Sequence, residues 1–376
     1  MSTNTAPTSS TNHIPWLDWM RFLAAFLVLL AHLRGQFFSE WSALEDASRT
    51  AFTFLFFSAT RLGNEAVITF FVLSGYLVGG RMINRVFAGT FNMKRYIADR
   101  SSRIYTPLLP AIVLTATAGI VLGHSDVAAS SFGSFISLQG TFFSVPPSNG
   151  PLWSLTYEVW FYVIAVTLPL VVAKNWTGAL VVVSLTAIVF AQLNAYYIFT
   201  WLFGALIYPV RLDCARRKVT FAIYGIILTV TGLAMSQLGT QGTLKVVQLG
   251  ENSAEIGLII FAFGFALLLG FITSLPVPQY GVFAKLYNFG MPLAGFSYST
   301  YLFHYPLLHL FVHFTNHQRV TAVTWSSFSV FMLILFSLLI ACYLAYQLFE
   351  ARTEIVRNWL YGVLHLPNTG KRSPVD

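Results

Sequence analysis

Three ionisable residues lie on one stripe of an otherwise apolar segment, WLDWMRFLAAFLVLLAHL, at residues 16–33. In a helix, the eleven steps from Arg21 to His32 return to within about 20° of one direction, and Asp18 lies within about 60°. Because histidine titrates near neutral pH, His32 could take a proton from a hydroxyl and return it. The structural alternative is a local pair of Asp18 and Arg21 with His32 capping the far end of the helix. The stripe indicates general acid-base catalysis inside an apolar helix.

A second group is basic and lies in the loop at residues 81–103, which runs into the string RSSRIYTP. Arg100 and Arg103 are three residues apart, so they are neighbours on one helical face, and arginine forks suit phosphate oxygens. Arg95 lies in the same loop. Charge count alone favours the alternative that this loop anchors the chain on anionic lipid. Because the two arginines of RSSR lie close together, phosphate binding is retained as a second hypothesis.

A carboxylate, Glu158, lies seven residues into the apolar string PLWSLTYEVWFY, which begins at Pro151 and also contains Trp153 and Tyr157. A carboxylate at that depth needs a partner, and an imidazole or a substrate hydroxyl would serve. A structural hydrogen bond to a neighbouring helix is the alternative.

Polar side chains recur in the string GFSYSTYLFHYPLL, which begins at Gly295. Ser297, Tyr301 and His304 share a helical face by their spacing of four and three, although His304 is as readily a packing residue as one that faces a ligand. Ser74 lies in AVITFFVLSGYL, whose small residues indicate close helix packing. The two cysteines give neither a metal-ligand spacing nor a disulfide framework, so no metal is expected.

The composition indicates which kind of fold positions these residues. The chain has 376 residues, 56% hydrophobic and 10% charged, whereas a soluble domain carries about 25% charged residues. Apolar segments recur at about 17 to 23 residues, the length that a helix needs to cross a bilayer. The sequence predicts an all-α, polytopic transmembrane helix bundle of about ten spans. They are expected at roughly 16–34, 62–80, 104–122, 151–173, 177–193, 196–210, 219–237, 255–274, 291–312 and 325–349.

The basic residues predict the orientation of this bundle. If both termini are cytoplasmic, the inside loops and tail carry sixteen Lys and Arg and the outside loops carry five, which favours N-in and C-in. The net charge of +8 is explained by these loops, so no nucleic acid partner is expected. Residues 1–13 lack a charged signal-peptide region, so the first apolar segment is expected to be retained. We divide the chain into a polar tail at 1–15, a transmembrane domain at 16–350 and a cytoplasmic tail at 351–376.

Taken together, these strings resemble the membrane-bound acyltransferase type 3 family, which O-acylates cell-surface polysaccharides and other exported molecules. Arg21, ten residues and then His32 match the marker of that family, and the strings with RSSR, WSLTYE, FFVLSG and SYSTYLFHYP look like its other markers. The resemblance runs from Asp18 to Pro306. Two departures are Asn64, where some relatives have His, and FEARTE after the last span, which lacks a Glu-x-Pro.

The resemblance implies transfer of an acyl group, most often acetyl, from cytoplasmic acyl-CoA to a hydroxyl of an exported carbohydrate or glycosylated acceptor. His32 would be the catalytic residue with Arg21 as its marker partner, and Arg100 and Arg103, with Arg95, would bind the CoA. Glu158 or Asp18 would orient the imidazole. The residues expected to line the cavity or contact the acceptor are Trp153, Tyr157, Ser297, Tyr301, His304 and Ser74.

Several points stay open at this stage. His32 could deprotonate the acceptor for direct attack or carry the acyl group itself. No bound cofactor is expected beyond the donor substrate acyl-CoA, and the resemblance places the chain in the bacterial inner membrane as a multi-pass protein in contact with the lipid bilayer. A homo-oligomer, the acceptor and the acyl chain length are not specified. The alternative function is a transporter or flippase of acyl groups or polysaccharide precursors, which two symmetric halves with discontinuous helices would favour; no such symmetry is seen.

Overall fold

The computed structural model describes residues 14–210, 212, 214–239, 252–276, 281, 285 and 293–367, and these residues form helices and no β-strand. The helices are, in chain order, α1 (Pro15–Phe37), η1 (Trp41–Ala43), η2 (Asp46–Ser48), α2 (Ala51–Ala59), α3 (Gly63–Ser74), the π-helix η3 (Gly75–Gly80), α4 (Arg81–Phe87), α5 (Met93–Val121), α6 (Val127–Phe135), η4 (Pro147–Leu152), α7 (Trp153–Ala165), α8 (Thr167–Val172), α9 (Trp176–Phe190), α10 (Tyr197–Ile207), α11 (Ala215–Gly239), α12 (Asn252–Thr273), α14 (Ser297–Thr315), α15 (Trp325–Leu348), η5 (Glu350–Arg352) and α16 (Thr353–Val363). The expected polar tail lies almost wholly outside these residues.

Seven helical stretches in the described part of the chain are long and apolar enough to cross a membrane. They are Pro15–Phe37, Ala51–Phe87, Met93–Val121, Pro147–Val172, Ala215–Leu238, Ser253–Thr273 and Trp325–Val363. The prediction of an all-helical multi-pass chain is therefore confirmed, whereas ten spans were expected. Of the three expected spans that are not among the seven, those at 177–193 and 196–210 form the shorter apolar helices α9 and α10, and the one at 291–312 corresponds to α14. With 11 residues, α10 is about 16 Å long, about half of the hydrocarbon thickness.

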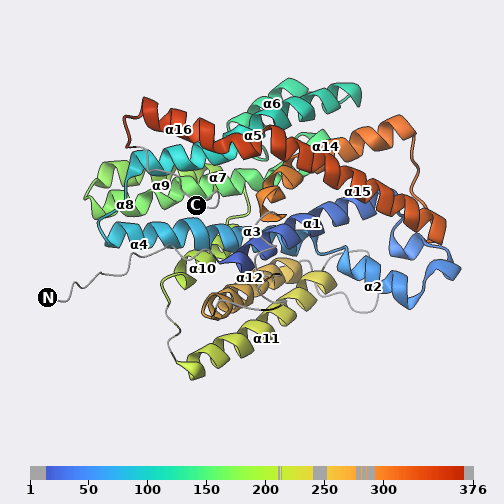
Figure 1. Ribbon diagram of the computed structural model, residues 1–376, viewed down its shortest axis with the longest axis horizontal. Coiled ribbons are helices and arrows are strands. Elements are labelled where there is room, and N and C mark those ends of the chain that lie inside the picture. Colours follow the sequence, from blue (N-terminus) through green and yellow to red (C-terminus); the bar gives the residue numbers. More distant parts are fainter. Residues whose placement is uncertain are drawn as a thin grey trace.

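Helix α1, which carries the ionisable stripe, packs against α3, α14 and α15 (Figure 1). Its buried residues include Ala24, Val28, Leu29 and Leu33. Proline at its first position suits a helix start, because the missing N–H would have no partner there. The polar stripe of α1 is therefore held between neighbouring helices.

Glycines let α10 approach the second long stretch, formed by α3 and η3, at backbone distance. A Cβ atom on Gly75 would lie 1.9 Å from the carbonyl oxygen of Trp201, and one on Gly204 would lie 1.9 Å from that of Val72. The close packing predicted from the small residues is confirmed. The same stretch winds as a π-helix from Gly75 to Gly80, a form that often occurs at functional sites.

Proline in α14 frees a carbonyl that a distant loop satisfies. Pro306 has no N–H, so the oxygen of Leu302, four residues earlier, lacks its usual helical donor. The side-chain amide of Asn149 in η4 donates to this oxygen at 3.0 Å and also to Oγ1 of Thr115 in α5 at 2.9 Å. A neighbouring element thus satisfies the freed carbonyl, and these hydrogen bonds fix α14 between η4 and α5.

Helix α16, within the expected cytoplasmic tail, was not predicted. It packs across α5 (Figure 1), where the hydroxyl of Tyr361 donates to Asp99 and the ring faces the Arg95 guanidinium at 5.3 Å. Three large apolar residues four apart form an exposed stripe on α16: Ile355, Trp359 and Val363. Such a stripe is typical of a helix that lies in the membrane interface.

Candidate active site

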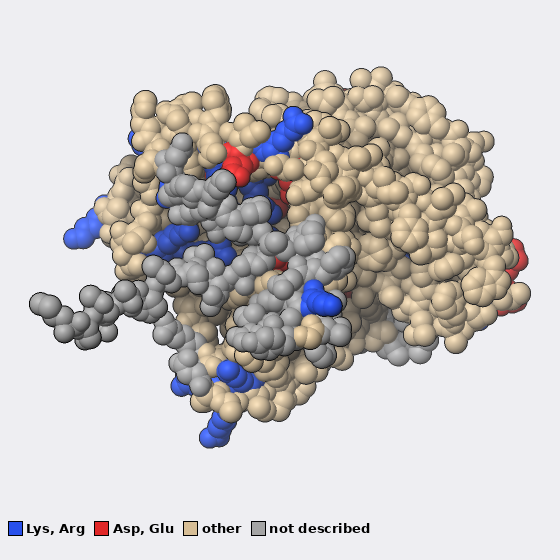
Figure 2. Space-filling model, viewed as in Figure 1, with Lys and Arg blue, Asp and Glu red and all other residues tan. Residues whose placement is uncertain are grey.

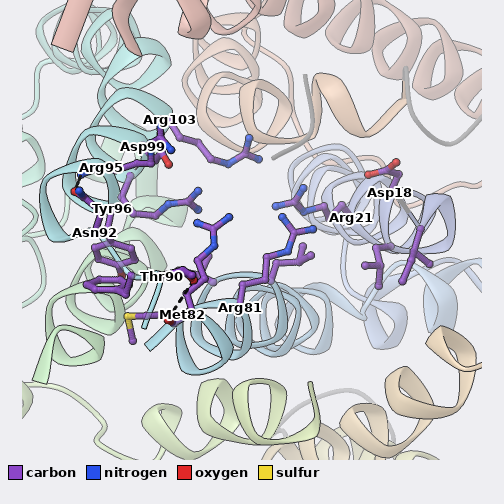
Figure 3. A pocket seen from close by; sticks show the side chains of 17 residues that line it. Asp18, Arg21, Arg81, Met82, Thr90, Asn92, Arg95, Tyr96, Asp99 and Arg103 are labelled. Carbon is purple, nitrogen blue, oxygen red and sulfur yellow. Dashed lines mark hydrogen bonds between the residues drawn. The ribbon is translucent and has the colours of Figure 1, made fainter. Parts of the chain in front are cut away.

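The described residues enclose a basic cavity of ≈ 330 Å³, within the size range of ligand pockets. Six arginines and two aspartates line it: Arg21, Arg81, Arg85, Arg95, Arg100, Arg103, Asp18 and Asp99. Figure 3 shows the guanidinium groups of Arg21, Arg81 and Arg103, from α1, α4 and α5, turned toward one open space. In the space-filling view, Lys and Arg gather on the left and in the middle of this face and none is seen at its right end (Figure 2). An excess of guanidinium groups around one cavity favours an anionic ligand.

The residues expected to bind CoA, Arg100, Arg103 and Arg95, thus lie in the wall of the basic cavity. Their contacts differ. Arg95 donates to the carbonyl oxygen of Pro367 at 3.0 Å and faces Tyr361, so its side chain is also engaged with the C-terminal segment. Arg100 lies over the ring of Tyr162 at 5.7 Å. Arg103 also lines the next cavity, described below.

A second, narrower cavity of ≈ 60 Å³ adjoins the first, since Arg21, Val78 and Arg103 line both. The structure brings four more of the expected residues into its wall: Ser74, Glu158, Ser297 and Tyr301. They come from α3, α7 and α14, so residues distant in sequence converge here. The two cavities lie side by side, and the second extends the space beside the arginines toward α7 and α14.

Glu158 is held by a short chain of hydroxyl groups. The hydroxyl of Tyr162, one turn later on α7, donates to its Oε1 at 2.5 Å. Ser74 in turn donates to the Tyr162 oxygen at 3.4 Å. The carboxylate therefore has a hydrogen-bond partner and faces the second cavity, and it interacts electrostatically with Arg21.

His32 pairs with His304, and the hydrogen bonds fix which nitrogen carries each proton. Nδ1 of His304 lies 2.7 Å from the carbonyl oxygen of Thr300, which can only accept, so this nitrogen carries the hydrogen. In the neutral ring, Nε2 of His304 then accepts, and Nδ1 of His32, at 3.0 Å, donates to it. This assignment leaves Nε2 of His32 as the nitrogen with the lone pair, ready to take a proton or attack a carbon.

The surroundings of this pair are aromatic and polar. The ring of Tyr305 meets the His32 ring edge to face at 5.0 Å, and it stacks on His309 at 4.3 Å. The side chain of Gln36 lies 3.4 Å from Nε2 of His309. The two histidines therefore lie at the start of a polar strip along α1 and α14, on the side away from the arginines.

Three residues expected to line the cavity or contact the acceptor, Trp153, Tyr157 and His304, line neither of these two cavities. Trp153 and Tyr157 belong to an aromatic cluster with Phe71 and Tyr197, with ring centroids 4.9 to 6.4 Å apart. The Tyr157 hydroxyl accepts from the backbone N–H of Asn194 at 3.0 Å. Likewise, His32 lines neither cavity, and the side-chain hydrogen-bond partner of its imidazole is His304 rather than Glu158 or Asp18.

Sequence reasoning missed Glu350. This buried carboxylate, at the start of η5, accepts from the backbone N–H of Ser299 at 2.9 Å and from its hydroxyl at 2.6 Å. It also interacts electrostatically with Arg103 and Arg21. A signal was present in FEARTE, because an acidic residue directly follows the last apolar span, at a membrane side expected to be basic.

Comparisons with known proteins agree with this arrangement. Residues 14–347 match a family model described as an acyltransferase domain. Nodulation protein 10 of Rhizobium leguminosarum bv. viciae is 29% identical over 198 residues, which are 46% of this chain and 49% of that protein. The chain thus spans about half the length of this curated relative. No solved structure matches the chain.

Proposed function

The chain belongs to the acyltransferase domain family, and from that premise we propose that it transfers an acetyl group from cytoplasmic acetyl-CoA to a hydroxyl of an exported carbohydrate or glycosylated acceptor. The family and the apolar helices make the chain a multi-pass membrane protein, and acyl transfer, its donor, its acyl group and its acceptor are proposed. The bacterial inner membrane is the proposed location.

One observation carries the proposal: the basic cavity adjoins the second cavity, and Arg21 and Arg103 line both. CoA carries its phosphates at one end and its thioester at the other. The cavity with six arginines suits the phosphates, and the narrower cavity lies where the slender arm that ends in the thioester would enter the helix bundle. Such a donor would place its acyl group inside the helix bundle, on the side where α1 continues toward His32.

In the proposed reaction, Nε2 of His32 takes the proton of the acceptor hydroxyl as its oxygen attacks the thioester carbon. The new C–O bond forms, the C–S bond breaks, and the leaving thiolate receives the proton from the imidazolium. His304 and the Thr300 carbonyl hold the tautomer that keeps this lone pair on Nε2. Arg21 lies about 16 Å from His32 along α1, so its charge serves the donor rather than the imidazole.

His304 is a positioning residue in this proposal, and its substitution tests the assignment. Loss of one neutral hydrogen bond costs about 0.5 to 1.5 kcal/mol, so we expect His304→Ala to lower kcat by up to about tenfold. The KM for acetyl-CoA should stay unchanged, because the arginines are far from this ring. His304→Gln, whose amide oxygen can accept from His32, should recover part of the rate. Equal loss in both variants, or a rise in the donor KM, would contradict the role.

The proposed orientation is N-in and C-in, which places the basic cavity at the cytoplasm. The split of sixteen basic residues against five supports it, as does the gathering of Lys and Arg at one end of the face in Figure 2. Acetyl-CoA, a polar anion that does not cross lipid, would then reach Arg100 and Arg103 directly.

Sealed membrane vesicles test function and orientation together. Acetyl-CoA labelled in its acetyl group is supplied outside inverted vesicles, whose cytoplasmic face is exposed, and outside right-side-out vesicles from the same cells. We expect covalent label on membrane carbohydrate, detected by mass spectrometry, with inverted vesicles only, and none from cells that lack the chain. Label that crosses the membrane without entering an ester would instead indicate a transporter. Labelling from right-side-out vesicles alone would reverse the orientation.

A further inference from the structure

The hydroxyl of Tyr298 is a buried polar group without a hydrogen-bond partner among the described residues. Tyr298 is the second residue of α14 and lines the second cavity with Arg21 and Glu158. Its ring stacks on that of Tyr301 at 6.3 Å with an interplanar angle of 8°. The ring is therefore held in place while its hydroxyl has no protein acceptor.

The other hydroxyl groups in the wall of this cavity are all engaged. Tyr301 donates to the carbonyl oxygen of Pro151, and Tyr162 donates to Glu158. The three serines that line the cavity, Ser74, Ser154 and Ser297, each have a hydrogen bond as well. A buried hydroxyl without a partner is unfavourable, and phenylalanine would provide the same ring without that cost. The contrast indicates that a ligand atom satisfies Tyr298.

The position of Tyr298 along α14 decides which part of a ligand it meets. Tyr298 precedes His304 by six residues, about 9 Å along the helix, and helical side chains lean toward the N-terminus. Its hydroxyl therefore lies on the side of Arg21 and Arg103 and away from the histidine pair. A donor with its phosphates among the arginines and its acyl group near His32 would pass this hydroxyl with the arm that joins them.

We propose that the hydroxyl of Tyr298 donates a hydrogen bond to an amide carbonyl oxygen in the pantetheine arm of acyl-CoA. This inference rests on the proposed function, in which acyl-CoA is the donor. The hydroxyl selects for an arm with a carbonyl at this depth. Phosphate binding by the arginines and arm binding by Tyr298 are then separate contributions to donor affinity.

Two probes separate these contributions in titrations of the full-length protein in detergent. Acetyl-CoA contains both ends of the donor, whereas adenosine 3′,5′-bisphosphate carries phosphates without the arm. Tyr298→Phe should weaken acetyl-CoA binding by about 3- to 10-fold, as expected for one neutral hydrogen bond, and leave binding of the bisphosphate unchanged. The matched control Tyr343→Phe, which removes a hydroxyl from the exposed part of α15, should change neither affinity.

Each outcome has a distinct meaning. Unchanged acetyl-CoA affinity in Tyr298→Phe, or equal weakening of both probes, overturns the assignment of Tyr298. If the wild-type protein binds neither probe, the donor of the proposed function is wrong instead. If Tyr298→Phe does not fold, the ligand is changed instead of the protein. Two acetyl-CoA analogues each have one amide carbonyl of the arm replaced by methylene, and one of them should bind the wild-type protein more weakly by the same factor. If neither analogue binds more weakly, the arm contact does not exist.

Discussion

His32→Ala is expected to lower the turnover of acyl transfer by about 10²- to 10⁴-fold, the range that a positioned general base contributes. The physical reason is the loss of Nε2, the nitrogen left with a lone pair by the chain from the Thr300 carbonyl through His304. Among the described residues, no other side chain forms a hydrogen bond with the imidazole of His32. The measurement is label transfer from acetyl-CoA in inverted vesicles, normalised to the amount of the protein in the membrane.

The matched control for this variant lies on α14. His313→Ala removes an exposed histidine nine residues beyond His304, so it should leave transfer at the wild-type rate. Donor affinity of His32→Ala should be unchanged, because His32 lines neither cavity. Acceptor acylation that persists in His32→Ala at normal abundance would show that the base is another group.

The double variant Arg100→Ala plus Arg103→Ala is expected to raise the KM for acetyl-CoA by about 100-fold or more. Hydrogen bonds to charged groups are worth about 1.5 to 3 kcal/mol each, so two lost phosphate contacts account for that factor. Turnover at saturating donor should change much less, because these residues lie at the phosphate end of the bound donor. Steady-state kinetics over a range of donor concentrations separates the two quantities.

Arg216→Ala plus Arg217→Ala is the control for charge and topology. These arginines are exposed at the start of α11, in a basic loop expected on the same membrane side. If the basic loops only anchor the chain on anionic lipid, both double variants should behave alike. A raised donor KM in the first pair alone indicates phosphate binding, while unchanged kinetics in both returns Arg100 and Arg103 to a topological role.

Local spacing predicted what depends on one helix. Arg100 and Arg103 share a cavity wall because residues three apart face the same way. The contact between His32 and His304 joins residues 272 apart. No periodicity reports which helices become neighbours, so a catalytic role for His32 was expected while its partner was sought in Glu158 or Asp18.

Packing also hid residues whose side chains look ordinary in the sequence. Tyr298 and Tyr301 lie in the same string, and only the bonds of Tyr301 to η4 and α7 distinguish the engaged hydroxyl from the unengaged one. Hydropathy likewise indicates apolar segments without giving their helical lengths. That is why α10, shortened to 11 residues beside the glycine contact with α3 and η3, was expected as a full span.

The meeting point of the two cavities, between Arg21 and Arg103, has a consequence for the energetics of the cell. An enzyme that takes its substrates from opposite faces risks becoming a leak for protons and sodium ions down the membrane potential. The guanidinium groups of Arg21 and Arg103, which line both cavities, repel cations and attract the anionic donor. Arginine excludes protons from water channels by the same repulsion. We infer that the same charges which recruit the donor also keep the membrane electrically sealed.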